Sequence, residues 1–168
     1  PKGSRLHLKS MPNTRDLGAL STEDGRLIIP KRLIRSGSLY HASLSDQDVL
    51  QNEYHLKEVI DFRTKAEILE KPDIVMEGVK YTEIPILDEE TMGISQSGSL
   101  PEMIIKFDQV PDTFIHKQYQ NFIRDPFCVK QYALFIDTLL HHEDGSVLWH
   151  CSAGKDRAGV GTAILLSA

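Results

Sequence analysis

Cysteine is scarce in this chain of 168 residues, which has only Cys128 and Cys151. Two cysteines build no disulfide framework, and such a chain suits a reducing compartment, so we expect a cytoplasmic location. No apolar run approaches the roughly 18 residues that a membrane-spanning helix requires, so no stable membrane insertion is expected. No secretory signal is visible either, although export by a route that needs no such signal stays open.

Positively charged residues are also fewer than negatively charged ones, with 19 Lys and Arg residues against 24 Asp and Glu residues. A net charge of −5 at pH 7 argues against nucleic acid and anionic membrane surfaces as partners. The length predicts one domain over residues 1–168 that can bury a core. The apolar helical pattern reaches Ala168 without a cap, so we expect the complete protein to continue beyond this residue.

Strand-like and helix-like segments alternate along the chain. This order predicts an α/β fold with a central, largely parallel sheet flanked by helices. Strands are expected at 27–29, 56–62, 81–87 and 146–150. Helices are expected to begin at Ser45, Thr64, Asp112 and Pro126 and near Ala158. The segment 88–101 is rich in Ser, Gly, Thr and Gln, and we expect a mobile loop there.

The most informative segment is His150–Gly159, with the order His-Cys-Ser-Ala-Gly-Lys-Asp-Arg-Ala-Gly. It joins a predicted strand to a predicted helix, and free backbone N–H groups at such a junction bind tetrahedral anions. The same positive potential favours the thiolate of Cys151. The planar fork of Arg157 can hold two oxygens of one anion. Together these groups predict phosphoryl transfer through a phosphocysteine.

The residues of this loop have distinct expected roles. Cys151 is the candidate nucleophile, whereas Cys128 is expected to be buried and structural. His150 is expected to orient the loop from a buried position. The candidate phosphate-binding residues are Ser152, Ala153, Gly154, Lys155, Asp156 and Arg157. Lys155 is also a candidate contact for a second phosphate of the substrate, although a solvated loop lysine would have the same pattern.

A general acid must protonate the leaving oxygen, and three aspartates are candidates. Asp156 lies within the loop itself. Asp112 follows a proline but also fits a helix N-cap. Asp61 lies at a strand end, where it would equally suit a hydrogen bond to Arg157 or to the loop. Backbone N–H groups and an arginine supply the charge stabilisation, so we expect no metal ion or other cofactor.

The loop is similar to the signature of cysteine-dependent protein tyrosine phosphatases. In detail it resembles a bacterial atypical branch that includes mycobacterial tyrosine phosphatase B. Three more segments, Asn13–Gly18, Arg35–Gly37 and Asp61–Glu67, resemble further elements of that branch. The resemblance implies the cysteine phosphatase fold with further helices beyond residue 168, and it favours Asp156 as the acid. It also implies hydrolysis of phosphomonoesters, with phosphorylated proteins or phosphoinositides as substrates.

Two positions depart from the family pattern. Many members carry Ser or Thr after the arginine, where a hydroxyl can bond the cysteine sulfur, but this chain has Ala158. Breakdown of the phosphoenzyme is therefore expected to be slower. A second glycine of the N-terminal element is replaced by Ala19, so the backbone turn there is expected to differ.

Residues outside the loop have supporting roles in this interpretation. Arg15 and Asp16 are expected to fix the N-terminal segment beside the loop. Arg35 and Arg63 would add positive potential or pair with carboxylates. His141 and His142 are expected to be solvated, because no third ligand lies near them in sequence.

Three other activities stay open at this stage. A phosphoinositide-preferring phosphatase would use the same loop. A sulfurtransferase also uses a cysteine in a cradling loop. A phosphoresidue-binding module without hydrolysis is the third alternative. The sequence sets neither the choice among them nor the oligomeric state.

Overall fold

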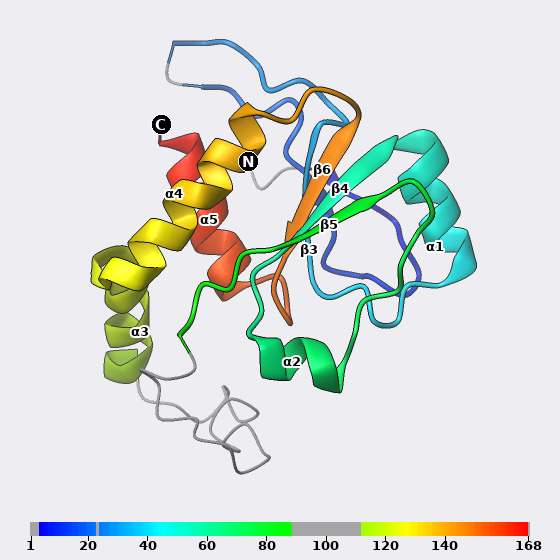
Figure 1. Cartoon of the computed structure of the whole chain (residues 1–168). Coiled ribbons are helices and arrows are strands. Elements are labelled where there is room, and N and C mark those ends of the chain that lie inside the picture. Colours follow the sequence, from blue (N-terminus) through cyan, green and yellow to red (C-terminus); the bar gives the residue numbers. More distant parts are fainter. Residues whose placement is uncertain (1–3, 23, 89–111, 168) are drawn as a thin grey trace.

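The computed structural model describes residues 4–22, 24–88 and 112–167. At its centre lies a six-stranded sheet in the order β1-β2-β3-β6-β4-β5 (Figure 1). The strands are β1 (Ser4–Arg5), β2 (Arg15–Asp16), β3 (Leu33–Ser36), β4 (Leu56–Asp61), β5 (Lys80–Glu83) and β6 (Ser146–His150). The helices are α1 (Leu44–Asp48), η1 (Val49–Glu53), α2 (Lys65–Glu70), α3 (Asp112–Arg124), α4 (Pro126–Leu140) and α5 (Asp156–Leu166).

The part of the sheet that leads into the site is parallel. Strands β3, β6, β4 and β5 run parallel to one another, whereas β1 pairs antiparallel with β2 and β2 pairs antiparallel with β3. The predicted α/β class with a largely parallel sheet is therefore confirmed. The carboxyl ends of the parallel strands meet at one edge, where open α/β sheets place their ligand sites.

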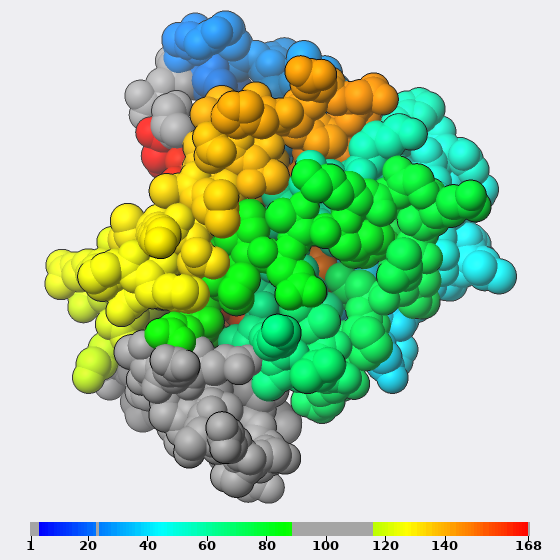
Figure 2. Space-filling view, viewed as in Figure 1, coloured from blue at the N-terminus to red at the C-terminus, as the bar shows by residue number. Residues whose placement is uncertain are grey.

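Helices cover both faces of the sheet (Figure 1). Helices α3, α4 and α5 lie on one side and α1 on the other, and Figure 2 shows α3 and α4 in yellow beside the green segments around β5. Successive residues of β6 feed two separate cores: Val147 and Trp149 pack on the α4 side, and Leu148 packs on the α1 side. This alternation buries every residue of β6 and fixes the register of the strand that leads into the loop.

Several local predictions are confirmed. The strands at 56–61 and 146–150 form, and the strand expected at 81–87 is the edge strand β5, which ends before Pro85. Thr64 and Glu67 make both hydrogen bonds of a capping box at α2. Asp125 caps α4, and Pro126 occupies the first turn of that helix.

Other local predictions were wrong. Residues 27–29 form no strand beyond an isolated bridge between Ser21 and Leu27, and the strand is β3 instead. Leu27 and Ile29 are 64% and 69% exposed, so their side chains find no core to bury against. Helix α1 is capped by Ser43 rather than by Ser45, since the Ser43 hydroxyl accepts a hydrogen bond from the Asp46 N–H.

Helix α4, which was predicted to begin at Pro126, does begin there and ends at Leu140. The segment expected to be a mobile loop lies, from residue 89 onward, outside the described residues. Across the part of the chain that is described, no helix combines the length and apolarity needed to cross a membrane.

Candidate active site

Strand β6 delivers Cys151 to the carboxyl edge of the sheet. His150, the last residue of β6, pairs with Ser36 of β3 on one side and with Asp61 of β4 on the other. Cys151 follows directly and is 3% exposed, and α5 begins five residues later at Asp156. The predicted strand, loop and helix are thus confirmed, with the thiol at the base of the loop.

The carbonyl oxygens of the loop all have partners outside it. Those of residues 151 to 155 accept, in order, from His150 Nδ1 at 3.0 Å, Ser38 N at 3.1 Å, Asn13 Nδ2 at 2.8 Å, Arg35 Nε at 3.0 Å and Arg35 Nη2 at 3.2 Å. In a trans peptide the N–H points away from the carbonyl. Carbonyls that bond to partners outside the loop leave the N–H groups of the same peptides free to face its interior, as an anion site requires.

Gly154 allows this loop to lie against β3. Its φ of +70° belongs to the left-handed region, which residues with a Cβ rarely adopt. A Cβ at this position would also come within 2.3 Å of the Ser36 carbonyl oxygen. Both constraints require glycine here, and they explain why the loop can pack tightly on the end of β3.

Arg157 is held by a carboxylate from α2. Its Nη1 and Nη2 each donate to Glu67, to Oε2 and Oε1 respectively, both at 2.7 Å. Burial disfavours the ionised carboxyl, but the hydrogen bonds and charge of Arg157 outweigh burial and help lower the pKa of Glu67 to about 2. This bidentate pair fixes the plane of the guanidinium at the mouth of the loop.

Glu67 also binds the loop and its own helix. Its Oε1 accepts from the Ser152 hydroxyl at 2.6 Å, and its Oε2 accepts from the Thr64 N–H at 2.9 Å. One side chain therefore joins the capping box of α2, the loop and Arg157. Glu67 lies within the family-like element 61–67, but its sequence context indicates no contact with Arg157.

Asp61 is not the partner of Arg157 that the sequence suggested. Its oxygens instead accept from Arg63, through Nε at 3.0 Å and Nη2 at 2.7 Å. Asp61 is buried and engaged in this pair, so it is poorly placed to protonate a leaving group. Strand β4 ends at Asp61, which therefore lies beside His150. The helix that follows, α2, carries Glu67, and this residue contacts Arg157 instead.

His150 occupies the buried position that the sequence predicted. Its Nδ1 lies 3.0 Å from the Cys151 carbonyl oxygen, and its Nε2 lies 2.6 Å from Asp73 Oδ2. Burial opposes the charge of Asp73, but the hydrogen bond from His150 leads the contacts that hold the pKa of Asp73 below its usual value. His150 thus ties the cysteine's own peptide to the segment after α2.

Asp61, Asp73 and His150 bring potential metal ligands within 4.8 Å of one another. A cation already occupies the space between the carboxylates, however. Arg63 Nη2 lies 2.7 Å from Asp61 and 3.0 Å from Asp73. The chemistry of this cluster is therefore that of a buried ion-pair network.

Asp156 is the first residue of α5 and is half-buried. Its Oδ1 accepts a hydrogen bond from the Tyr119 hydroxyl of α3, a contact that the sequence gave no means to foresee. Asp112, the rival acid, is the first residue of α3, and its side chain is outside the description. Lys155 is exposed beside Asp156.

The N-terminal segment reaches the loop through other residues than those predicted. Asp16 accepts from the N–H groups of Gly18 and Lys31, so it fixes its own segment and not the loop. Arg15 lies close enough to Arg35 to disfavour that residue's charge. The direct ties to the loop are Asn13, for which the sequence gave no partner, and Arg35. Arg35 was expected to add positive potential or to pair with carboxylates, and the structure shows it donating to carbonyl oxygens of the loop instead.

Cys128 behaves as the predicted structural cysteine. It is buried, and its thiol donates to the Ile86 carbonyl oxygen at 3.1 Å. Burial is the first cause that raises the pKa of Cys128, to about 11. Such a thiol is a poor nucleophile at neutral pH.

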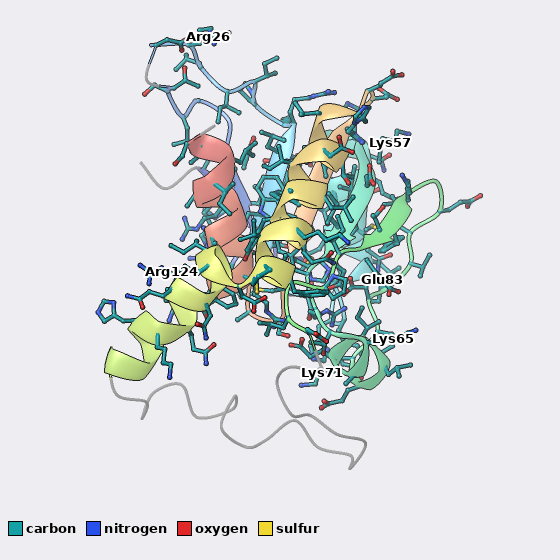
Figure 3. All side chains as sticks on the ribbon, turned by 60° about the vertical axis from the view of Figure 1, so that its left-hand side comes forward. Arg26, Lys57, Lys65, Lys71, Glu83 and Arg124 are labelled. Atoms are coloured by element: carbon teal, nitrogen blue, oxygen red, sulfur yellow. The ribbon has the colours of Figure 1, made fainter. Side chains whose placement is uncertain are left out.

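Exposed lysines lie near the ends of α2. Lys65 is the first residue of the helix, and Lys71 follows its last. Figure 3 shows both at one end of the molecule and Lys57 far from them, toward the start of β4. Since α2 follows the carboxyl end of β4, these two lysines add positive charge on the side of the sheet that bears the loop.

The site thus combines a buried cysteine, an arginine held by a carboxylate and a tight loop at the carboxyl ends of parallel strands, which is the geometry of an anion-binding site. In agreement, the model of the tyrosine phosphatase family matches residues 6–168, and the chain belongs to that family. It is 29% identical over 164 residues to a protein of Cupriavidus necator named "Putative tyrosine-protein phosphatase". It is 27% identical over 140 residues to a tyrosine-protein phosphatase of Nostoc commune.

These alignments cover 97% and 79% of this chain. They cover 57% of the Cupriavidus protein and 42% of the Nostoc protein. The chain thus spans about half the length of the relatives it matches.

Proposed function

We propose that this chain is a phosphomonoester hydrolase of the protein tyrosine phosphatase type, with Cys151 as nucleophile. The observation that carries the proposal is the outward anchoring of five consecutive loop carbonyls around a buried cysteine. This anchoring supports a loop whose N–H groups face the sulfur and would bind three phosphate oxygens there. Arg157, held by Glu67, completes the anion site from one side.

The proposed reaction has two steps. In the first, the Cys151 thiolate attacks phosphorus, the bond to the leaving oxygen breaks, and Asp156 gives that oxygen a proton. In the second, water attacks the phosphocysteine, Asp156 takes a proton from the water, and the sulfur leaves as thiolate. Inorganic phosphate is released and the enzyme returns to its starting state. The N–H groups of the loop and the guanidinium of Arg157 balance the negative charge of the phosphoryl group, so the proposed reaction needs no metal ion.

We infer that the natural substrates include phosphotyrosine in proteins. The exposed Lys65 and Lys71 favour acidic or phosphorylated partners by charge. Exposed Lys155 beside the loop also supports a substrate with a second phosphate, so phosphoinositides are the second candidate class. The loop signature further supports membership of the bacterial atypical branch.

The test compares Cys151→Ser with Cys128→Ser, using nitrophenyl phosphate as substrate and inorganic phosphate as ligand. Cys151→Ser is expected to abolish turnover while phosphate still binds. Cys128→Ser is expected to keep turnover, because that thiol lies apart from the loop. Turnover by Cys151→Ser would overturn the proposal. Sulfur transfer from thiosulfate without hydrolysis by the unmodified chain would favour the sulfurtransferase alternative.

Asp156 is tested separately as the acid. Asp156→Asn is expected to slow hydrolysis of phenyl phosphate, which has a poor leaving group, by a factor on the order of 100. It should slow nitrophenyl phosphate much less, because nitrophenolate leaves without a proton. Equal slowing of both substrates would remove Asp156 from this role and return attention to Asp112.

A further inference from the structure

Tyr119 joins helix α3 to the candidate general acid. Its hydroxyl donates to Asp156 Oδ1, across 37 positions of sequence. Its ring meets Phe122, one turn further along α3, edge to face with centroids 6.1 Å apart. Phe122 is 6% exposed and belongs to the core against α4. The ring that carries the hydroxyl therefore packs on the buried Phe122 side chain, and this packing positions the hydroxyl.

The charges around Tyr119 keep its hydroxyl a donor. Burial first, and then the Asp156 carboxylate, raise the pKa of Tyr119 to about 12. The Arg35 guanidinium from β3 acts in the opposite direction, and the Cys151 thiolate acts with Asp156. With a pKa of about 12, Tyr119 carries its proton throughout the pH range in which such an enzyme would work.

We propose that Tyr119 is a positioning residue that orients Asp156 for proton transfer. The proposal rests on the proposed function, in which Asp156 is the general acid. The hydrogen bond from Tyr119 occupies Oδ1 and leaves Oδ2 to carry the proton toward the leaving oxygen. Tyr119 keeps its own proton throughout, so it acts on the substrate only through Asp156.

The contact also gains strength as the reaction proceeds. When Asp156 loses its proton to the leaving oxygen, its carboxyl becomes a carboxylate. A hydrogen bond to a charged acceptor is stronger than one to a neutral carboxyl. Interactions that strengthen between ground state and transition state accelerate the chemical step. Tyr119 is thus expected to matter most for leaving groups that require the proton.

The test uses Tyr119→Phe, which keeps the ring on Phe122 and removes only the hydroxyl. We expect kcat/KM to fall about tenfold with phenyl phosphate and less than about twofold with nitrophenyl phosphate. Tyr54→Phe is the matched control, since Tyr54 lies just before the amino end of β4, whereas the loop lies at the carboxyl ends of the parallel strands. It is expected to leave both rates unchanged. Equal loss on both substrates with Tyr119→Phe, or no loss on either, would overturn the proposal.

A double-mutant cycle separates this inference from the proposed function. In an Asp156→Asn background, Tyr119→Phe should have no further effect on phenyl phosphate hydrolysis. An additional tenfold loss there would show that Tyr119 acts independently of Asp156 and would overturn the inference alone. If Asp156→Asn itself slows both substrates equally, the acid assignment falls, and the role of Tyr119 falls with it.

Discussion

Glu67 and Arg157 form a buried, bidentate ion pair in which both N···O distances are 2.7 Å. The two residues come from helices that follow neighbouring parallel strands, β4 and β6. Glu67 also accepts from Ser152 in the loop and from the Thr64 N–H. The geometry of the arginine therefore depends on α2 as much as on its own helix.

Glu67→Gln is expected to destabilise the fold and to weaken phosphate binding. The variant keeps the shape of the side chain but leaves the buried charge of Arg157 without a counter-charge, which costs about 3–5 kcal/mol in comparable cases. Urea unfolding and phosphate titration measure the two effects. Glu70→Gln is the control, because Glu70 is exposed at the end of the same helix. Similar stability and phosphate affinity for the two variants would contradict the role assigned to Glu67.

The contribution of Glu67 to the free energy of unfolding is expected to depend on pH under acidic conditions. Its pKa is lowered from 4.5 to about 2 in the folded chain despite its burial. A group with a depressed folded pKa stabilises the fold above its unfolded pKa, and that contribution is lost as pH falls toward the folded value. The lowering corresponds to about 3 kcal/mol.

The difference in unfolding free energy between the unmodified chain and Glu67→Gln should therefore stay constant above about pH 5.5, where the unfolded carboxyl is ionised. It should shrink by about 3 kcal/mol between there and pH 2. Urea unfolding at a series of pH values provides the measurement. A difference that does not change over this range would show that Glu67 is not held as a carboxylate.

Gly154→Ala is expected to cost more than Gly78→Ala, although both glycines have positive φ values of +70° and +74°. At Gly78 a Cβ would meet no atom within 4 Å, so that variant has only the backbone strain of about 1–2 kcal/mol. At Gly154 the Cβ would also collide with the Ser36 carbonyl. We expect Gly154→Ala to abolish phosphate binding as well, measured by titration. Retained binding would mean that the loop does not depend on its contact with β3.

Ala19→Gly is expected to stabilise the chain by about 0.5 kcal/mol. Ala19 has a φ of +63°, which lies in the left-handed region that favours glycine, so alanine is an unfavourable residue at this position. Whether the turn differs from that of the family stays a prediction. Ala133→Gly, on the exposed face of α4, is the control and should destabilise by about 1 kcal/mol. Thermal unfolding compares them, and a loss of stability in Ala19→Gly would refute the strain.

Local patterns predicted the elements that bear the site. The apolar run before Cys151, the strand at 56–61 and the Thr64 capping box depend on short-range chemistry, and all three form. The error at residues 27–29 shows the limit of such patterns. The three apolar residues suit a strand, but Leu27 and Ile29 stay exposed while the more polar Leu33–Ser36 takes the place beside β6.

The partners of the site residues were harder to predict, because they depend on the order of the strands. Glu67 has the sequence context of a helix cap, and its contact with Arg157 arises only because β4 lies next to β6. His142 is a similar case. It was expected to be solvated, yet it is largely buried, with Nδ1 3.0 Å from the Glu58 carboxylate.

Direct detection of phosphate on Cys151 tests whether this thiol is the nucleophile. The chain is mixed with nitrophenyl phosphate, quenched in acid during turnover and digested, and the peptide that contains Cys151 is analysed by mass spectrometry. We predict a phosphorylated Cys151 in the unmodified chain and none in Cys151→Ser. Steady hydrolysis with no phosphate on Cys151, or with phosphate on another side chain, would contradict the account.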